Sequence, residues 1–335
     1  MVKSKSANLK VLITRPISDV GLSILKRENY ELINNTKEYP LKPIELKRLV
    51  KGVDAILCFL NDTIDKETMD IAGPNLKIIS TFSTGFEHID IKEAKKRNIK
   101  VGYTGNILTE TTADLAFGLM LSIGRRIVEG DKMVRDGKWN YGWGPDLMIG
   151  TDIHGKTLGI IGMGKIGTAI AKRAQGFGMK ILYTNRATNT KSKIKSFPFD
   201  YTNIKLTDLK DIAKESDYII ISCSLNEESY HLINSNFISQ MKKSAFLINI
   251  ARGKILNQKD LILALRKKSI AGAALDVYED EPIKKDSILK RMKNTVLLPH
   301  IGSASRDTRD KMSEIAALNI VNVLQGHEDK ALLIE

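Results

Sequence analysis

The sequence predicts an α/β protein built from two doubly wound parallel-sheet domains. Three observations support this prediction. Short apolar runs alternate with amphipathic stretches, the alternation occurs in two separate series, and the chain of 335 residues is too long for one ordinary core. Because helix-like stretches follow the apolar runs, each series indicates a buried parallel sheet that is covered by helices.

The two series of apolar runs define the two expected sheets. The first consists of KVLIT from Lys10, DAILCF from Asp54, KIIST from Lys77 and IKVGY from Ile99. The second consists of KTLGIIG from Lys156, KILYT from Lys180, DYIIIS from Asp217, AFLINI from Ala245, AGAALDV from Ala271 and TVLLPH from Thr295. Runs of this length between helix-like segments are typical of strands in βαβ units.

A long, mostly apolar segment connects the two series. Residues 109–137 start with the threonine and acid pattern of a helix N-terminus and predict one long buried helix. A loop rich in glycine and tryptophan, residues 139–155, follows it. Residues 305–324 predict a last helix that returns to the first domain. We therefore expect a first domain of residues 1–104 plus 305–335 and a second domain of residues 105–304.

The composition is that of an ordinary globular protein, with 42% hydrophobic and 27% charged residues. The first ten residues lack the apolar region of a signal peptide, and the apolar stretch from Leu115 to Ile123 is too short to cross a bilayer. Cys58 and Cys223 lie inside apolar runs, which predicts buried thiols in a reducing compartment rather than a disulfide framework. We expect a cytoplasmic protein with no membrane partner.

The net charge of +13 does not by itself indicate a nucleic-acid partner. The lysines are scattered in doublets such as Lys242 and Lys243, with no basic arm, and the aromatic residues are too few to supply stacking platforms. We expect no nucleic-acid partner. A positive surface of this kind attracts small anions.

A glycine-rich turn predicts the cofactor site. The run LGIIGMGKIGTAIAKR places Gly162, Gly164 and Gly167 after a buried strand and at the start of an amphipathic helix. In this context the first glycine makes the tight turn, the second lets the backbone approach a pyrophosphate, and the third allows close helix packing. Free N–H groups at the helix N-terminus favour the phosphates. The alternative is a glycine-rich turn that binds no ligand.

The end of the second strand of this unit predicts which dinucleotide binds. Sites that prefer NAD carry an acidic residue here to bond the ribose 2′-hydroxyl, but this chain has Asn185 followed by Arg186. An arginine side chain can bind a 2′-phosphate by donating charge-assisted hydrogen bonds, whereas a carboxylate would repel the phosphate. We therefore expect NADPH to be preferred, with NAD possible. The alternative is that Arg186 stacks on the adenine or faces solvent.

Three segments that follow apolar runs supply candidate catalytic residues: INIARG with Arg252, LDVYEDEP with Glu281, and LLPHIGSAS with His300. Reduction of a 2-oxo acid needs a cation for the carboxylate, a proton donor for the carbonyl oxygen, and a carboxylate that keeps this donor protonated. Arg252, His300 and Glu281 match these roles in turn. Taken singly, each has a structural alternative: a buried ion pair, a strand-end histidine, or a solvated acidic turn.

Several segments match sequence blocks of one known family. They are STGFEHID from Ser83, TGNILTETTADLAFGLML from Thr104, GKTLGIIGMGKIG from Gly155, INIARG from Ile248, LDVYEDEP from Leu275 and PHIGSAS from Pro299. The chain resembles the D-isomer-specific 2-hydroxyacid dehydrogenases over nearly its full length. Within that family, YTNR from Tyr183, CSL from Cys223 and PHIGSA are similar to glyoxylate and hydroxypyruvate reductases, a subgroup that commonly prefers NADPH.

The resemblance implies an NADPH-dependent reduction of glyoxylate or hydroxypyruvate to the D-2-hydroxy acid, with His300 as proton donor. It also implies a Rossmann cofactor domain inserted in a flavodoxin-like substrate domain, and a homodimer formed through the cofactor domain. The implied cofactor contacts are Thr112, Gly162, Met163, Gly164, Lys165, Ile166, Gly167, Asn185, Arg186, Ala187, Cys223, Ser224, Leu225, Ile250, Ala251, Arg252, Asp276, His300 and Gly302. The implied substrate contacts are Leu60, Thr84, Gly85, Arg252 and His300.

The last observations concern a metal site and two alternative functions. No C-x-x-C or H-E-x-x-H motif occurs, and the spacing of His88, His154, His231 and His327 does not suit a metal, so we expect none. A dinucleotide-sensing corepressor shares the fold and the three catalytic residues, but the chain lacks long appended tails. A related dehydrogenase with another substrate also remains open, because pocket size depends on side chains near Leu60, Asn61 and Phe86.

Overall fold

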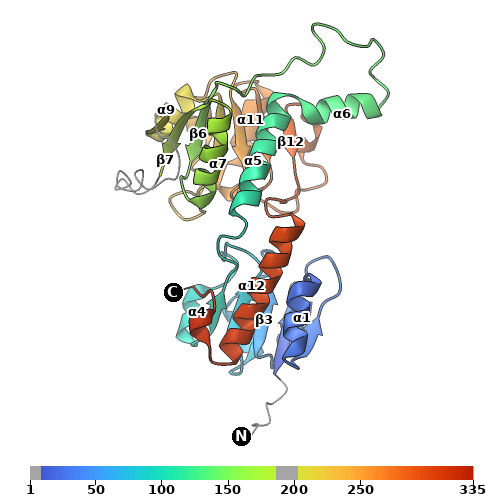
Figure 1. The fold of residues 1–335 in the computed structure, drawn as a ribbon, viewed down its shortest axis with the longest axis vertical. Coiled ribbons are helices and arrows are strands. Elements are labelled where there is room, and N and C mark those ends of the chain that lie inside the picture. Colours follow the sequence, from blue (N-terminus) through green and yellow to red (C-terminus); the bar gives the residue numbers. More distant parts are fainter. Residues whose placement is uncertain (1–8, 186–202, 335) are drawn as a thin grey trace, which may run out of the picture. The chain divides into compact units, whose positions relative to one another are not determined.

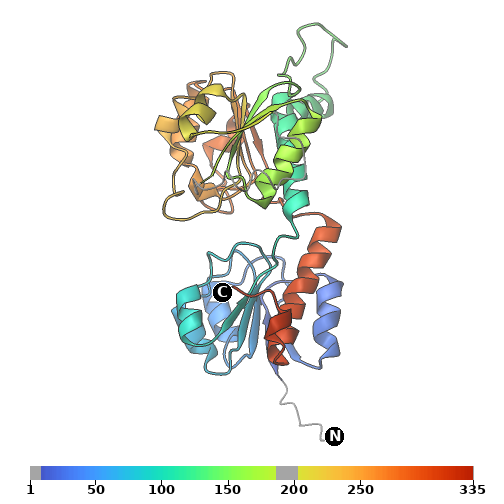
Figure 2. The ribbon, with the colours of Figure 1, turned by 60° about the vertical axis from the view of Figure 1, so that its left-hand side comes forward.

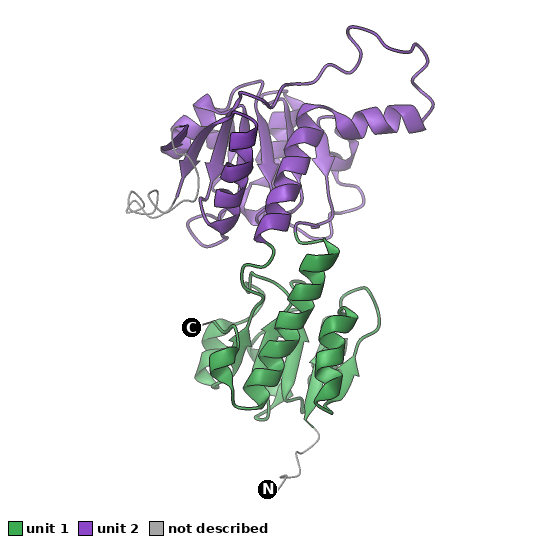
Figure 3. Cartoon of the chain, in the orientation of Figure 1, with its two compact units in different colours: residues 1–108, 303–335 green, residues 109–302 purple. Residues whose placement is uncertain are grey.

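The computed structural model describes residues 9–185 and 203–334. The chain divides into two compact units, residues 1–108 with 303–335 and residues 109–302 (Figure 3). Each unit contains one parallel sheet with helices packed on it (Figures 1 and 2). The predicted α/β class with two parallel sheets is therefore confirmed.

The first unit has a five-stranded parallel sheet with the order β2-β1-β3-β4-β5. Its strands are β1 (Lys10–Ile13), β2 (Glu31–Asn34), β3 (Ala55–Cys58), β4 (Ile78–Thr81) and β5 (Lys100–Gly102). The strands β3 and β4 are buried at every residue, which explains why they appear in the sequence as continuous apolar runs. The strand order reverses between β1 and β3, so the loops that follow these strands flank a topological switch point.

The helices of the first unit cover both faces of this sheet. They are α1 (Asp19–Arg27), α2 (Pro43–Leu49), α3 (Lys66–Ala72), α4 (Ile91–Lys96), α12 (Arg306–Leu324) and the 3-10 helix η3 (Glu328–Lys330). Leu12 packs in one core with residues of α2 and α3, whereas its neighbours Val11 and Ile13 pack in a second core with α12. The alternation of side chains along a strand places these neighbours on opposite faces.

The second unit has a seven-stranded parallel sheet with the order β12-β11-β10-β9-β6-β7-β8. Its strands are β6 (Thr157–Ile161), β7 (Lys180–Thr184), β8 (Ile204–Leu206), β9 (Tyr218–Ile221), β10 (Phe246–Asn249), β11 (Gly272–Leu275) and β12 (Thr295–Leu297). The order reverses at β6, which lies between β7 and β9. The carboxyl ends of β6 and β9 therefore flank the switch point where ligands of such sheets bind.

The helices of the second unit are α5 (Thr109–Gly124), α6 (Ile127–Arg135), α7 (Lys165–Gly176), α9 (Leu209–Glu215), α10 (Ser235–Ile238), α11 (Gln258–Arg266) and the 3-10 helices η1 (Gly253–Ile255) and η2 (Ile288–Arg291). The buried residues of α5 and α7 share one core with strands of the sheet, and α11 contributes to the other core. Among the described residues, no helix is both long and apolar enough to span a membrane.

The prediction of one long buried helix over residues 109–137 is wrong. The chain forms α5 and then α6, and Arg126 between them adopts a left-handed conformation with φ 55°. A returning segment ends α5, because Thr151 N donates to Gly124 O at 2.7 Å. Only α5 is buried, since α6 has no buried residue. The prediction of two buried thiols is right for Cys58 and wrong for Cys223, which is half-buried.

The packing of α1 against α12 depends on Gly21. A Cβ atom at this position would lie 2.3 Å from Ser313 Oγ and 2.4 Å from Ser313 O. We expect Gly21→Ala to destabilise the protein by about 1–3 kcal/mol, because the two helices must move apart. The midpoint of urea unfolding, followed by circular dichroism, measures this. Gly176→Ala on α7 is the control, since a Cβ there meets nothing within 4 Å. Equal midpoints for the two variants would contradict the packing argument.

Candidate active site

The glycine-rich turn after β6 is shaped by close backbone contacts. Gly162 has φ 101°, and a Cβ on it would lie 2.6 Å from Cys223 N and Cα. A Cβ on Gly167 would lie 2.2 Å from Gly162 O. Ser222 Oγ donates to Gly162 O at 2.7 Å and fixes the same peptide. The first and third glycines are therefore required by the packing of the turn itself.

Gly164 differs from these two glycines, because a Cβ there would meet nothing within 4 Å. It is the exposed N-cap residue of α7, and no side chain caps this helix end or places an acid in its first turn. The first N–H groups of a helix have no partner within the helix, and they attract anions. The open space at Gly164 fits a diphosphate group that approaches the backbone. Gly164, Lys165 and Ile166 would hold it.

The residues that are predicted to select the dinucleotide lie only partly within the described structure. Asn185 directly follows β7 and is half-buried, so the position carries an amide and no carboxylate. Arg186 and Ala187 lie outside the described residues. Cys223, Ser224 and Leu225 follow β9, where the Cys223 backbone faces Gly162. The described part of the predicted cofactor set thus gathers at the carboxyl ends of the strands, with Thr112 buried on α5.

Asp276, directly after β11, fixes the loop that carries His300. Its buried carboxylate accepts hydrogen bonds from Ile301 N at 2.7 Å and Gly302 N at 2.8 Å, and its backbone oxygen accepts from His300 N at 2.9 Å. Burial raises the pKa of Asp276, although the two amides and the charge of His300 oppose this. Thr112 Oγ1 donates to Gly302 O at 3.1 Å from α5. His300 is held at φ 57°, a conformation that costs about 1–2 kcal/mol for a residue with a side chain.

This loop brings His300 onto Glu281. His300 Nδ1 lies 2.7 Å from Glu281 Oε2, and Glu281 Oε1 accepts from Tyr278 N at 3.0 Å. Burial raises the pKa of Glu281, but the hydrogen bond and charge of His300, with smaller effects of Tyr278 and Arg252, hold it below its ordinary value. An ionised Glu281 accepts a hydrogen bond from Nδ1–H, so Nε2 is the ring nitrogen that remains for a substrate.

Arg252 lies on the adjacent loop, which follows β10. Asn249 shapes this loop, since its side chain accepts from Ala251 N at 3.1 Å and donates to Arg252 O at 3.0 Å. A Cβ on Gly253 would lie 1.8 Å from Tyr278 C and O, so only a glycine allows the two backbones to pack this closely. The close packing brings Arg252 near enough for its charge to lower the pKa of Glu281.

A second histidine and carboxylate pair supports the same loops and was missed by the sequence reasoning. His231 Nε2 lies 2.7 Å from Glu279 Oε1, and Glu279 Oε1 also accepts from Gln258 N at 3.0 Å, at the start of α11. Glu279 is therefore not merely part of a solvated acidic turn. No spacing in the sequence indicates this pair, because its members belong to different loops.

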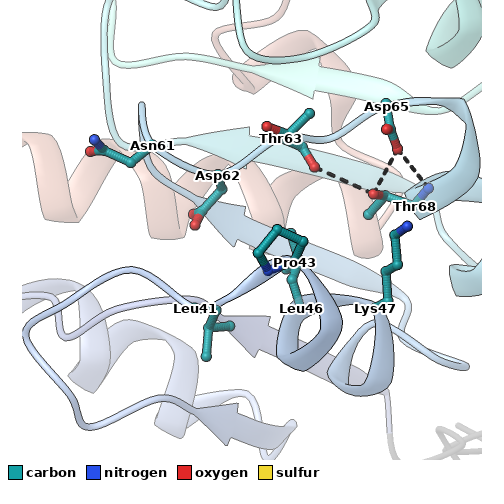
Figure 4. A pocket seen from close by; sticks show the side chains of 9 residues that line it. All are labelled: Leu41, Pro43, Leu46, Lys47, Asn61, Asp62, Thr63, Asp65 and Thr68. Atoms are coloured by element: carbon teal, nitrogen blue, oxygen red, sulfur yellow. Dashed lines mark hydrogen bonds between the residues drawn. The ribbon is translucent and has the colours of Figure 1, made fainter. Parts of the chain in front are cut away.

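The predicted substrate residues Leu60, Thr84 and Gly85 lie in the first unit, in the loops that follow β3 and β4. Thr84 Oγ1 donates to Gly105 O at 2.7 Å and ties the loop after β4 to the segment after β5. A separate pocket of about 270 Å³ lies between α2 and the segment that leads into α3 (Figure 4). None of Leu60, Thr84 and Gly85 lines this pocket, so it is not the candidate site. Within the described ranges, no cluster of three or more His, Cys, Asp or Glu residues suits a metal ion.

Comparisons with known proteins indicate one family for this chain. Residues 117–302 match the family described as D-isomer specific 2-hydroxyacid dehydrogenase, NAD binding domain. A glyoxylate reductase of Thermofilum pendens is 44% identical over 329 residues, which are 98% of this chain and 95% of the relative. A glyoxylate reductase of Pyrococcus horikoshii is 44% identical over 321 residues, with 95% and 93% covered.

Solved structures show the same fold. A protein from Thermus thermophilus has a TM-score of 0.89 and 37% identity, with 98% of this chain and 100% of that chain covered. An NADPH-dependent glyoxylate/hydroxypyruvate reductase from Sinorhizobium meliloti, in complex with NADP and malonate, has a TM-score of 0.79 and 28% identity, with 95% and 94% covered.

The lowered pKa of Glu281 makes its contribution to stability dependent on pH. A carboxylate whose pKa is lower in the folded than in the unfolded chain stabilises the protein above the unfolded value, about 4.3, and this contribution is lost as the pH falls through the folded value. We expect Glu281→Gln to be less stable than the wild type at pH 7, and the gap to narrow toward pH 4. Urea unfolding at both pH values measures the gap. Glu227→Gln, at an exposed carboxylate, is the control. A gap that widens in acid would contradict the assignment.

Proposed function

This chain belongs to the D-isomer-specific 2-hydroxyacid dehydrogenase family and is thus a nicotinamide-dependent enzyme, and from this we propose that it reduces glyoxylate or hydroxypyruvate to the D-2-hydroxy acid with NADPH. The observation that carries the proposal is the 2.7 Å contact of His300 Nδ1 with Glu281 Oε2. It leaves Nε2–H of His300 for the carbonyl oxygen of a substrate. The names of the similar glyoxylate reductases support this substrate class.

The chemistry divides among the three residues. A reduced nicotinamide, when bound, supplies a hydride to the carbonyl carbon. His300 delivers the proton from Nε2 to the carbonyl oxygen, so that the oxo group becomes a hydroxyl group. Glu281 holds the imidazole in its orientation through the contact with Nδ1. Arg252 binds the substrate carboxylate through charge-assisted hydrogen bonds and polarises the carbonyl group.

A loop of the first unit offers backbone groups that fit a carboxylate. Among residues 9–185 and 203–334, the N–H groups of Thr84 and Gly85 have no hydrogen-bond acceptor. Successive free N–H groups in a loop form an anion-binding concavity. The loop follows β4 at the carboxyl edge of its sheet, where ligands of such folds bind. Leu60 follows the neighbouring strand β3 in the same sheet, and we place it at the substrate as well.

The proposed preference for NADPH rests on the end of β7. Asn185 offers no negative charge that would repel a 2′-phosphate, and Arg186 is the next residue in the chain. The reductase from Sinorhizobium meliloti, which this chain resembles, is NADPH-dependent and binds NADP. Thr112, Asp276 and Gly302 would flank the nicotinamide, since Thr112 and Asp276 both bond to the Gly302 backbone.

We also propose that the chain forms a homodimer through α6 and the loop of residues 139–149. Large apolar side chains project here without covering from their own chain. They include Ile127, Val128, Val134, Trp139, Tyr141, Trp143 and Ile149, whose exposed fractions range from 51% for Val128 to 93% for Tyr141. Large apolar side chains that are exposed together along one segment are typical of a protein interface.

The proposed reaction is tested by NADPH absorbance with glyoxylate, hydroxypyruvate, pyruvate and 2-oxogluconate, and by the same panel with NADH. We expect turnover of glyoxylate or hydroxypyruvate on the order of 1 per second or faster, with NADPH preferred. His300→Ala should lower kcat by about 10²–10⁴-fold, because the proton donor is lost, while NADPH binding stays intact. His327→Ala, at the exposed end of α12, is the control. Binding of NADPH without turnover of any of these acids would contradict the proposed reaction and favour a dinucleotide-sensing role.

The proposed dimer is tested by light scattering on a gel-filtration column. Val134→Asp on α6 places a charge in the proposed interface and should shift the protein toward the monomer, because the charge is costly to desolvate. Ile44→Asp on α2 is the matched control, since Ile44 is 77% exposed on the other unit. A dimer that persists unchanged in Val134→Asp would contradict this interface.

A further inference from the structure

A chain of hydrogen bonds lies beneath the proposed carboxylate loop. His88 Nε2 lies 3.0 Å from Thr81 Oγ1, and Thr81 Oγ1 lies 2.7 Å from Ser83 Oγ. Ser83 Oγ in turn donates to Gly85 O at 2.5 Å. Thr81 and Ser83 are buried, with exposed fractions of 0% and 3%. The chain therefore runs from an imidazole through two hydroxyl groups, both buried, to the backbone of the loop.

The chemistry of its last acceptor fixes the direction of this chain. A carbonyl oxygen can only accept hydrogen bonds, so Ser83 must donate its single hydroxyl hydrogen to Gly85 O. Ser83 Oγ then accepts a hydrogen bond from the Thr81 hydroxyl group, which donates its only hydrogen in this bond. Thr81 Oγ1 must consequently accept from His88, and His88 must carry a proton on Nε2. If Nε2 were instead an acceptor, no hydrogen would remain for the contact between Thr81 and Ser83.

The surroundings of His88 support this arrangement. Its backbone oxygen accepts from Ile64 N at 3.0 Å, which ties the residue to the loop after β3. The Cys58 Sγ atom lies 3.8 Å from His88 Nε2, and burial raises the pKa of this thiol well above its ordinary value. The Thr81 oxygen, at 3.0 Å, is the nearer and stronger partner of Nε2.

The chain of bonds also determines which way the loop peptide faces. The Ser83 hydroxyl holds the Gly85 carbonyl toward the buried side of the loop. Because a trans peptide points its C=O and the following N–H in opposite directions, the N–H of Phe86 turns away from Ser83. The free N–H groups of Thr84 and Gly85 precede it in the same loop. The carbonyl dipole that would repel an anion is thereby kept away from them.

We propose that His88, acting through Thr81 and Ser83, is a positioning residue for the substrate carboxylate. It does not touch the substrate. It supplies the Nε2–H donor that orients both hydroxyl groups and thus holds the Gly85 carbonyl inward. The inference rests on the proposed function, because it assumes that this loop binds the carboxylate of a 2-oxo acid.

The test compares two substitutions of His88 in the full-length enzyme. Gln places an N–H donor near the position of Nε2, whereas Leu removes the donor. We expect His88→Leu to raise the KM for glyoxylate about tenfold, the effect of losing one hydrogen bond at the binding loop, with kcat and the KM for NADPH within about twofold of wild type. His88→Gln should stay near wild type in all three constants. Thr81→Val, which replaces the buried hydroxyl group by a methyl group and so interrupts the chain, should match His88→Leu.

Thermal unfolding of each variant, followed by circular dichroism, shows whether it is folded. If His88→Leu does not fold, the comparison of Thr81→Val with His88→Gln decides. An unchanged KM for glyoxylate in Thr81→Val and His88→Leu overturns the inference, as does an equal rise in His88→Gln and His88→Leu. A parallel loss of kcat and of NADPH binding overturns it as well, since that pattern indicates general damage.

Failure of the proposed function is distinguished by the wild-type enzyme, which would then turn over none of the 2-oxo acids. The direction of the chain is still decided in that case. A nitrogen-15 NMR spectrum of the wild-type imidazoles assigns the proton of His88, and a neutral ring protonated on Nδ1 overturns the inference independently of activity.

Discussion

The arrangement of the candidate active site depends on one buried carboxylate. Asp276 accepts from two consecutive backbone amides, Ile301 and Gly302, and its own carbonyl oxygen accepts from His300 N. These three bonds hold His300 in a left-handed conformation that a side chain otherwise avoids. The direction in which the imidazole meets Glu281 follows from that conformation. The imidazole of His300 is thus positioned by its backbone, and the carboxylate of Glu281 contacts its Nδ1 atom, so that Nε2 is the other ring nitrogen.

Glycine residues determine how the loops of the second unit approach one another. Gly162 lets the cofactor turn lie against Cys223, and Gly253 lets the Arg252 loop lie against Tyr278. At both places the atoms in contact are largely backbone atoms, which cannot move aside as a flexible side chain can. The two segments of each contact follow different strands, and these contacts hold the loops of the candidate cofactor and catalytic residues in place. The charges and hydrogen bonds of the candidate site then act between loops whose backbone positions these contacts already hold.

Much of the fold could be predicted from the sequence because its signals are local. Apolar runs buried on both faces indicated the parallel strands, and Gly162, Gly164 and Gly167 follow a strand and open a helix as expected. The break at Arg126 was missed, since it arises where the segment around Thr151 returns to cap α5. The pair of His231 with Glu279 was missed for the same reason, because its members come from separate loops and no spacing or periodicity records them. The chain from His88 was missed although Thr81, Ser83 and Gly85 are close to it in the sequence, because its bonds depend on how this one loop turns.

The first unit is assembled from both ends of the chain, with consequences for its folding. Met312, Ala316 and Ile320 of α12 cover one face of the sheet, and Ser80 on β4 bonds to Ala316 O. The strands of that sheet leave the ribosome long before this helix is synthesised. Until then, an apolar surface made of Val11, Ile13 and their neighbours lacks its cover. The inserted second unit is complete earlier, so nascent chains pass through a stage in which the middle can be folded while the beginning still awaits its last helix.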